Sequence, residues 1–169
     1  MRYFVVYKPY HVLSQFSGEG NKQTLADYFK VPPDVYPLGR LDYDSEGLLL
    51  LTNDKAVNHL LLHPSQAHER TYWVQVEGSI TSEAIDHLIK GITITVDGKP
   101  FTTKPAQAEK FIAAPGVPPR NPPIRFRKNI PDSWISLTLR EGKNHQVRKM
   151  TAATGFPTLR LIRYSINNI

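Results

Sequence analysis

The residues best suited to chemistry lie in one short segment, residues 39–47. Five ionisable side chains occupy positions 40–47, and Arg40 precedes Asp42 by two positions, so both share one side of an extended backbone. Four leucines follow at positions 48–51 and predict a short strand buried on both faces. The segment therefore lies at the end of a core strand, where a rigid scaffold can position reactive groups. A charged turn without chemistry is the alternative interpretation.

A second candidate segment is Arg70-Thr71-Tyr72-Trp73-Val74, which is aromatic and alternates as strands do. Alternation places Tyr72 and Trp73 on opposite faces of that strand, so one points inward and the other outward. The sequence does not decide which of the two aromatic rings is the buried one. An aromatic side chain that only faces the core is the alternative to a functional ring.

A third candidate segment is the basic stretch at residues 142–149. On a helix, His145, Arg148 and Lys149 follow one another at intervals that place all three on one face. Such a face, close to a helix N-terminus, could bind phosphate. A solvated basic face has the same pattern, so this segment alone does not establish a binding site.

Other kinds of site find little support. The chain has no cysteine, so disulfides and Cys-ligated zinc are excluded. His59 and His63 have a spacing that a metal could use, but no third ligand is indicated. No phosphate-binding glycine loop, dinucleotide fingerprint or Gly-x-Ser-x-Gly elbow is present. We therefore expect no metal and no cofactor, and chemistry on a nucleic acid if the protein is an enzyme.

Net charge is +6 over 169 residues, but the charge is unevenly distributed. Residues 1–100 carry 9 Lys and Arg against 12 Asp and Glu, and residues 101–169 carry 12 against 3. A basic half beside an acidic half indicates a polyanionic partner, with a merely solubilising basic face as the alternative. No stretch is apolar over a membrane-spanning length, and the N-terminus is too short for a signal peptide. We expect a cytoplasmic protein with no membrane partner.

The elements that must position these segments mix strands and helices without a regular βαβ rhythm. Apolar alternation predicts strands over residues 3–7, 70–76, 134–139 and 159–166, and Asp97-Gly98 predicts a hairpin turn. Capping residues predict helices over residues 24–29, 54–63, 81–90 and 145–154. The first two of these end at prolines. Asn53 or Asp54 is expected to cap the second, which carries Val57, Leu60 and Leu61 on one face. The predicted fold class is α+β, a mixed and largely antiparallel sheet flanked by helices, in a single catalytic domain of two lobes.

Residues 115–131 are rich in proline and are predicted to form a loop. The loop carries four cations, Arg120, Arg125, Arg127 and Lys128. It is either an arm that touches RNA or a simple connector, and the sequence does not distinguish the two.

Together the segments resemble the RsuA-type pseudouridine synthases, which act on ribosomal RNA, and among these most closely the large-subunit synthase E subtype. The matching segments, in the family's order, are Lys8-Pro9, Gly39-Arg40-Leu41-Asp42, residues 45–54, Tyr72 in a Thr-Tyr-x-Val strand, residues 145–150 and Leu161-Ile162-Arg163. The chain departs from the family at Arg70, where relatives often have Lys, and at Asn167, where Gly is usual. We expect no N-terminal S4-type RNA-binding domain of the kind that many relatives carry, and we expect the catalytic body to supply the RNA contacts.

The resemblance implies that uracil is detached from C1′ of the ribose, rotated and rejoined through C5. It makes Asp42 the catalytic aspartate, which attacks the sugar carbon or removes the neighbouring 2′ proton. Arg148 then provides the charge that keeps this carboxylate ionised, with Arg40 as an alternative partner. Tyr72 is expected to stack on the uracil. Asp44 is interpreted as structural or solvent-facing, as is Glu46.

The target uridine must be flipped out of structured RNA, at a cost of a few kcal/mol that phosphate contacts can offset. The predicted RNA-binding residues are Lys8, Arg40, Arg70, Lys143, His145 and Arg163. We expect a monomer whose partner is ribosomal RNA, in particular the large-subunit (23S) rRNA. A non-catalytic RNA-binding or ribosome-assembly module on the same scaffold is the main alternative, and hydrolysis of a nucleoside or nucleotide is a third.

Overall fold

The computed structural model describes residues 1–169, apart from the side chain of Pro64, and the chain divides into two compact units. The first unit is Met1–His68 and the second is Glu69–Ile169. Each unit has its own strand pairings and its own hydrophobic core. Among the described residues, no helix has the length and apolar composition that crossing a bilayer requires.

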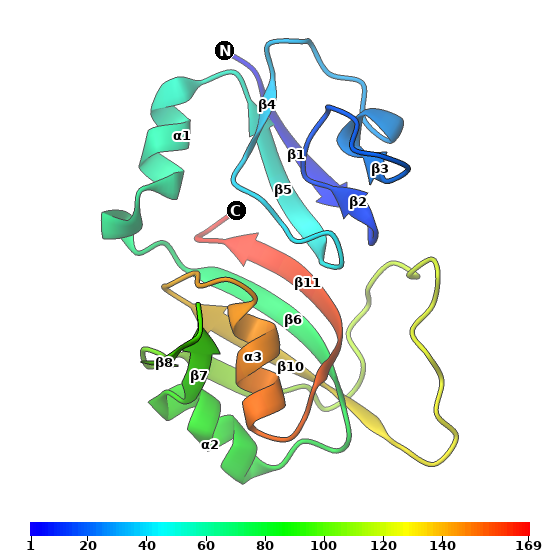
Figure 1. Cartoon of the computed structure of the whole chain (residues 1–169), viewed down its shortest axis with the longest axis vertical. Coiled ribbons are helices and arrows are strands. Elements are labelled where there is room, and N and C mark those ends of the chain that lie inside the picture. Colours follow the sequence, from blue (N-terminus) through cyan, green and yellow to red (C-terminus); the bar gives the residue numbers. More distant parts are fainter. The chain divides into compact units, whose positions relative to one another are not determined.

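The sheet of the first unit is antiparallel and is built around the predicted leucine strand, β5 (Glu46–Thr52) (Figure 1). β5 pairs with β1 (Tyr3–Lys8) on one side and with the short β4 (Tyr36–Leu38) on the other. The leucines at positions 49, 50 and 51 are buried, as the sequence predicts. The end of this strand is therefore a rigid support for the residues that precede it.

Small elements complete the first unit. They are β2 (Val12–Leu13), β3 (Gln23–Thr24), the 3-10 turns η1 (Leu25–Asp27) and η2 (Pro64–Gln66), and helix α1 (Lys55–Leu62). The two short strands pair in parallel, which no alternation in the sequence predicts. The helix predicted over residues 24–29 is only the single turn η1, because so short a segment cannot propagate a helix after the costly first turn. Thr24 caps this turn as expected.

Helix α1 begins after Asp54, one of the two predicted caps, and its apolar face is not fully covered. None of the residues of α1 is buried, and Leu60 is 53 % exposed. Within its unit the helix contacts the short strand β4 and the turn η2. Val57 and Leu61 are partly buried, so the apolar face is only partly covered.

The second unit contains a four-stranded antiparallel sheet. In spatial order its strands are β11 (Thr158–Ile166), β6 (Arg70–Glu77), β10 (Asp132–Leu139) and β9 (Gln107–Lys110). The predicted strands at residues 70–76, 134–139 and 159–166 are confirmed, and β9 was not predicted. β11 contains two irregularities in its register with β6, and between them Arg163 faces Tyr72.

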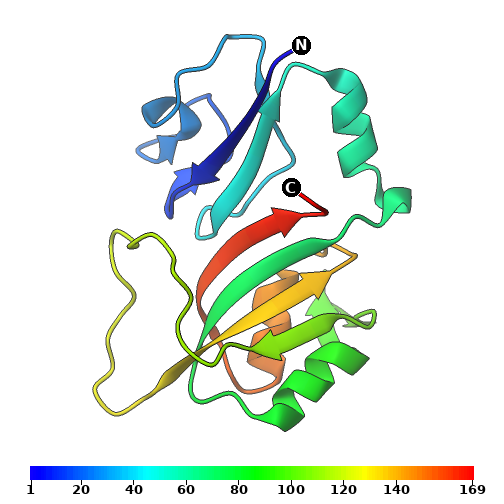
Figure 2. The same cartoon turned by 180° about the vertical axis from the view of Figure 1, so that it is seen from behind.

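Helices α2 (Ser82–Lys90) and α3 (Gln146–Ala153) cover a hydrophobic core on one face of this sheet. In Figure 1, α3 lies in front of β10, and Figure 2 shows the sheet from the side opposite α3. Val74 and Val76 of β6, Leu88 of α2 and Met150 of α3 meet in the core. The predicted fold class, α+β with a largely antiparallel sheet and flanking helices, is confirmed.

The predicted hairpin consists of β7 (Thr93–Val96) and β8 (Lys99–Thr102). Asp97 and Gly98 between the strands both have positive φ, 50° and 74°, as a type I′ turn requires. The hairpin is therefore confirmed at the predicted dipeptide.

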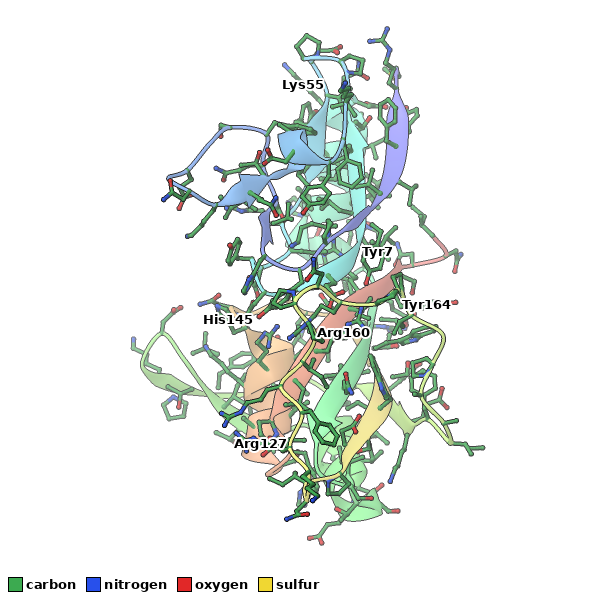
Figure 3. All side chains as sticks on the ribbon, turned by 90° about the vertical axis from the view of Figure 1, so that its right-hand side faces the viewer. Tyr7, Lys55, Arg127, His145, Arg160 and Tyr164 are labelled. Carbon is green, nitrogen blue, oxygen red and sulfur yellow. The ribbon has the colours of Figure 1, made fainter. Side chains whose placement is uncertain are left out.

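The proline-rich loop has no regular structure but is tied to β11. The Arg160 guanidinium donates to the Pro118 carbonyl oxygen at 2.6 Å, and Arg120 donates to the Leu159 carbonyl oxygen at 3.2 Å. In Figure 3 the loop passes beside Arg160 and then reaches Arg127. Arg127 forms a 3.2 Å ion pair with Glu77 of β6. These contacts hold the loop against strands β6 and β11.

Candidate active site

In the first unit, Asp42 lies in the turn between β4 and β5, and hydrogen bonds hold the backbone on both sides of it. The Ser14 hydroxyl donates to the Leu41 carbonyl oxygen at 2.7 Å and accepts from the Leu41 amide at 3.0 Å. The His11 amide donates to the Tyr43 carbonyl oxygen at 2.9 Å. The Asp42 carbonyl oxygen itself accepts from the Ser45 amide at 3.0 Å, which closes a turn. The segment predicted to carry the chemistry is therefore rigidly held.

Glu46, the first residue of β5, is buried and accepts a hydrogen bond from the Tyr7 hydroxyl at 3.0 Å. This contact joins the two paired strands β1 and β5, which supports the structural role that the sequence suggested for Glu46.

The two predicted RNA contacts of the first unit have very different surroundings. Lys8 is fully buried, and its ammonium donates to the carbonyl oxygens of Pro9 at 2.8 Å and Val12 at 2.7 Å. Both bonds lie within the turn that leads into β2. Arg40 is exposed and reaches Gln15, whose side-chain oxygen lies 3.5 Å away. Of the two, Arg40 has the accessible guanidinium.

In the second unit, the pairing of β6 with β11 brings Tyr72 and Arg163 together. Arg163 is buried and hydrogen-bonds the Tyr72 side chain. Burial lowers the pKa of Arg163 from its ordinary value, the charge interaction and hydrogen bond with Tyr72 oppose that change, and the Arg70 cation adds to it. The Tyr72 side chain and the Arg70 cation thus both interact with the buried Arg163 guanidinium.

The two neighbouring aromatic residues of β6 occupy opposite faces of the sheet, as alternation requires. Tyr72 is partly buried and packs against the core beneath α2 and α3. Trp73 lies on the other face, stacked on Tyr164 with ring centroids 4.0 Å apart and in edge contact with Phe111. Tyr72 is therefore the aromatic residue on the face that Arg163 shares, and Trp73 belongs to a separate aromatic cluster.

The third segment forms the start of α3, with one correction. The helix begins at Gln146, and His145 precedes it in a left-handed conformation, φ 52° and ψ 30°, without a side-chain capping bond. The helix thus starts one residue later than predicted, and the His145 carbonyl oxygen accepts from the Lys149 amide at 3.0 Å. Gln146 closes the preceding loop, accepting from the Lys143 amide and donating to Glu141, both at 2.9 Å.

The basic residues around this helix start differ in exposure. Lys143 and His145 are exposed, and the Lys143 ammonium lies 5.1 Å from the centre of the Phe101 ring. Arg148 is half-buried, because the adjacent residues Val147 and Met150 face the core. The second unit thus brings together Tyr72, Arg70 and Arg163 on its sheet, and Lys143, His145 and Arg148 around the start of α3.

Sequence reasoning missed Ser14 and His11. Neither residue belongs to a recognisable charged motif, and the strand between them has only two residues. The bonds from Ser14 span 27 positions along the chain, and no local pattern reports such a contact. A polar residue directly after a short apolar pair was the only available signal.

Comparison with known proteins shows which family this chain resembles. The family model described as "RNA pseudouridylate synthase" matches residues 2–153. "Ribosomal large subunit pseudouridine synthase E" from Xanthomonas axonopodis pv. citri (strain 306) is 52 % identical over 163 residues, covering 95 % of this chain and 83 % of the relative. The protein of the same name from Vibrio parahaemolyticus serotype O3:K6 (strain RIMD 2210633) is 50 % identical over 162 residues, with 96 % and 66 % covered.

A solved structure gives the same result. "Crystal structure of pseudouridylate synthase" superposes with a TM-score of 0.77 at 28 % identity, covering 99 % of this chain and 63 % of that one. The chain therefore belongs to the RNA pseudouridylate synthase family. It is an RNA pseudouridine synthase, similar over most of its length to the two bacterial synthases E, as the resemblance implied. The findings favour this enzyme over a non-catalytic module.

Proposed function

We propose that this protein converts one or more uridines of large-subunit ribosomal RNA to pseudouridine, with Asp42 at the reacting centre and no cofactor. The observation that carries the proposal is the family match across residues 2–153, a range that contains Asp42, Tyr72 and Arg148. The printed names of the two bacterial relatives support large-subunit rRNA as the substrate. The backbone bonds on both sides of Asp42 support its role, because a group that must meet one sugar carbon needs a fixed direction.

The reaction is an isomerisation. Uridine and pseudouridine contain the same atoms, and one proton exchanges with solvent on the way. Asp42 either attacks C1′ of the ribose or removes the 2′ proton, and either route breaks the bond from C1′ to N1 of uracil. The detached uracil rotates, and its C5 forms the new bond to C1′. On the first route the bond between Asp42 and C1′ breaks in this step, and on the second route Asp42 returns the proton to C2′. The hydrogen on C5 then leaves to solvent, and N1 takes up a proton. Water must be kept from C1′ until the uracil is recaptured.

Two further residues, Tyr72 and Arg148, have proposed catalytic roles beside Asp42. Tyr72 stacks on the uracil, and Arg148 supplies positive charge at the reacting centre, which are the roles that the resemblance implies. The surroundings of the predicted RNA contacts divide them into two groups. We assign phosphate contacts to the exposed Arg40, Lys143 and His145 and to the half-buried Arg70. The buried residues Lys8 and Arg163 are assigned positioning roles instead.

The experiment that tests the proposal maps pseudouridine in rRNA from cells with and without the gene for this protein. We expect one or a few large-subunit positions to change from pseudouridine to uridine on deletion and to return when the wild-type gene is restored. Small-subunit rRNA from the same cells is the internal control and should be unchanged. Identical pseudouridine maps with and without the gene would contradict the proposal.

A further inference from the structure

The backbone around Asp42 is held by a segment that no sequence motif marks, residues 10–14. Ser14 makes two bonds to the same residue, Leu41, since its hydroxyl donates at 2.7 Å to the carbonyl oxygen and accepts from the amide at 3.0 Å. That carbonyl belongs to the peptide group whose nitrogen is that of Asp42. The Ser14 hydroxyl is therefore bonded directly to the peptide that carries the proposed catalytic carboxylate.

A second set of contacts fixes the backbone on the other side of Asp42. The His11 amide donates to the Tyr43 carbonyl oxygen at 2.9 Å, and the His11 ring lies nearly parallel to the Tyr43 ring, 7° between planes and 4.7 Å between centroids. Tyr10 stacks on the other face of His11 at 3.7 Å. The Lys22 ammonium lies 5.3 Å from the centre of the Tyr43 ring. The residue after Asp42 is thus held by one backbone bond and a column of rings.

Burial makes the Ser14 contact hard to replace. Ser14 is 4 % exposed and Leu41 is 7 % exposed. Water therefore has little access to the Leu41 amide and carbonyl if the hydroxyl is removed, and buried backbone groups without partners are strongly unfavourable. The peptide must then move to find new partners. Val12 of the same segment is fully buried in the core, which fixes the position from which Ser14 acts.

We propose that Ser14 is a positioning residue for the reaction, which sets the direction of the Asp42 carboxylate through the Leu41 peptide. This inference rests on the proposed function, because it takes Asp42 as the group that meets the ribose. Ser14 itself need not touch RNA. A small displacement of a reacting group costs rate far more than it costs affinity, so the loss should appear in the chemical step.

The test compares Ser14→Ala with Ser45→Ala. The Ser45 hydroxyl is also buried and close to Asp42 in sequence, but among the described residues it has no hydrogen-bond partner. Both variants lose one buried hydroxyl, and only the first loses bonds to the peptide of Asp42. Ser14→Cys keeps a side chain of similar size with poor hydrogen bonding and serves as a second variant should Ser14→Ala not fold.

The measurements are single-turnover pseudouridine formation at saturating rRNA, rRNA affinity by filter binding, and thermal unfolding. For Ser14→Ala we expect the single-turnover rate to fall about tenfold or more, with affinity within about threefold of wild type. Ser14→Cys should fall in the same direction, and Ser45→Ala should react as wild type does. Ser14 variants that react within about twofold of wild type would overturn the inference, as would equal losses in Ser14→Ala and Ser45→Ala.

Failure of the inference can be told from failure of the proposed function. If the wild-type enzyme forms pseudouridine and Asp42→Asn does not, the function stands and the Ser14 variants decide the inference by themselves. If the wild-type enzyme forms no pseudouridine in any rRNA offered, the proposed function fails before Ser14 is considered.

Discussion

At the scale of single residues, the buried guanidinium of Arg163 is the unusual feature of the second unit. A buried cation is tolerated only with good hydrogen-bonding partners, and the Tyr72 side chain is one of them. The contact also orients Tyr72, because it fixes the hydroxyl at the far end of the ring. The residue proposed to stack on uracil is therefore held by a residue that the sequence marked only as an RNA contact.

Tyr72→Phe removes this hydrogen bond while keeping the ring. Because hydrogen bonds to charged groups are stronger than neutral ones, we expect the free energy of unfolding to fall by about 2 kcal/mol. Urea denaturation followed by fluorescence measures the change. Tyr164→Phe is the control, since Tyr164 lies on the opposite face of the same sheet and is half exposed. Equal stability of Tyr72→Phe and Tyr164→Phe would show that the Arg163 contact contributes little.

The sequence predicts single residues only where a motif marks them. Asp42, Tyr72 and Arg148 were singled out through a family resemblance, and no periodicity could have given them their roles. The surroundings of Lys8 were not predictable in the same way, since its ammonium donates to two backbone carbonyls that no motif indicates. Burial of a charged side chain depends on the fold around it, which residue type alone does not reveal.

At the scale of elements, caps and turns were predicted well because they depend on neighbouring residues. Thr24, Asp54 and Thr81 cap the segments that they were expected to cap. The exposure of α1 could not be predicted, because an apolar period does not say whether a surface is available to cover the face. The short strand β4 was missed for a related reason, since its three residues form a strand only by pairing with β5.

The cap of α1 also makes stability depend on pH. Asp54 accepts from the Ala56 amide at 3.0 Å and from the Tyr3 hydroxyl at 2.6 Å. The Tyr3 bond is the main cause that holds the pKa of Asp54 below its ordinary value. A carboxyl group with a lowered pKa in the folded state contributes stability above its unfolded pKa, about 3.9, and this contribution is lost as pH falls through the folded value.

Tyr3→Phe should therefore be less stable than wild type at pH 7, with a smaller difference at pH 3, where Asp54 approaches protonation in both proteins. Urea midpoints at the two pH values measure this. Tyr28→Phe is the matched control, because it removes a tyrosine hydroxyl bonded to the neutral Gln23 side chain at 2.8 Å. Its effect should not change with pH. If Tyr3→Phe lowers stability equally at pH 3 and pH 7, the Asp54 charge does not contribute to the effect.

At the scale of the whole molecule, the sequence indicated the kind of partner and the fold class, but it did not indicate which strands pair. The basic residues at 101–169 fit a polyanion, and the fold class was predicted from the mixture of elements. The pairing of β6 with β11 joins residues about 90 positions apart, and local patterns carry no information on such a pairing. The contacts of Arg163 with Tyr72, and of Ser14 with Leu41, both arise from long-range packing of this kind.

The central claim is that Asp42 carries out the isomerisation. Tritium release from rRNA labelled with 5-³H-uridine reports the loss of the C5 hydrogen, which accompanies every pseudouridine formed. The account predicts that Asp42→Asn folds and binds rRNA as wild type does but releases tritium only at background level. Asp34→Asn makes the same acid-to-amide change in the same unit and should release tritium as wild type does. Release from Asp42→Asn at the wild-type rate would contradict the account.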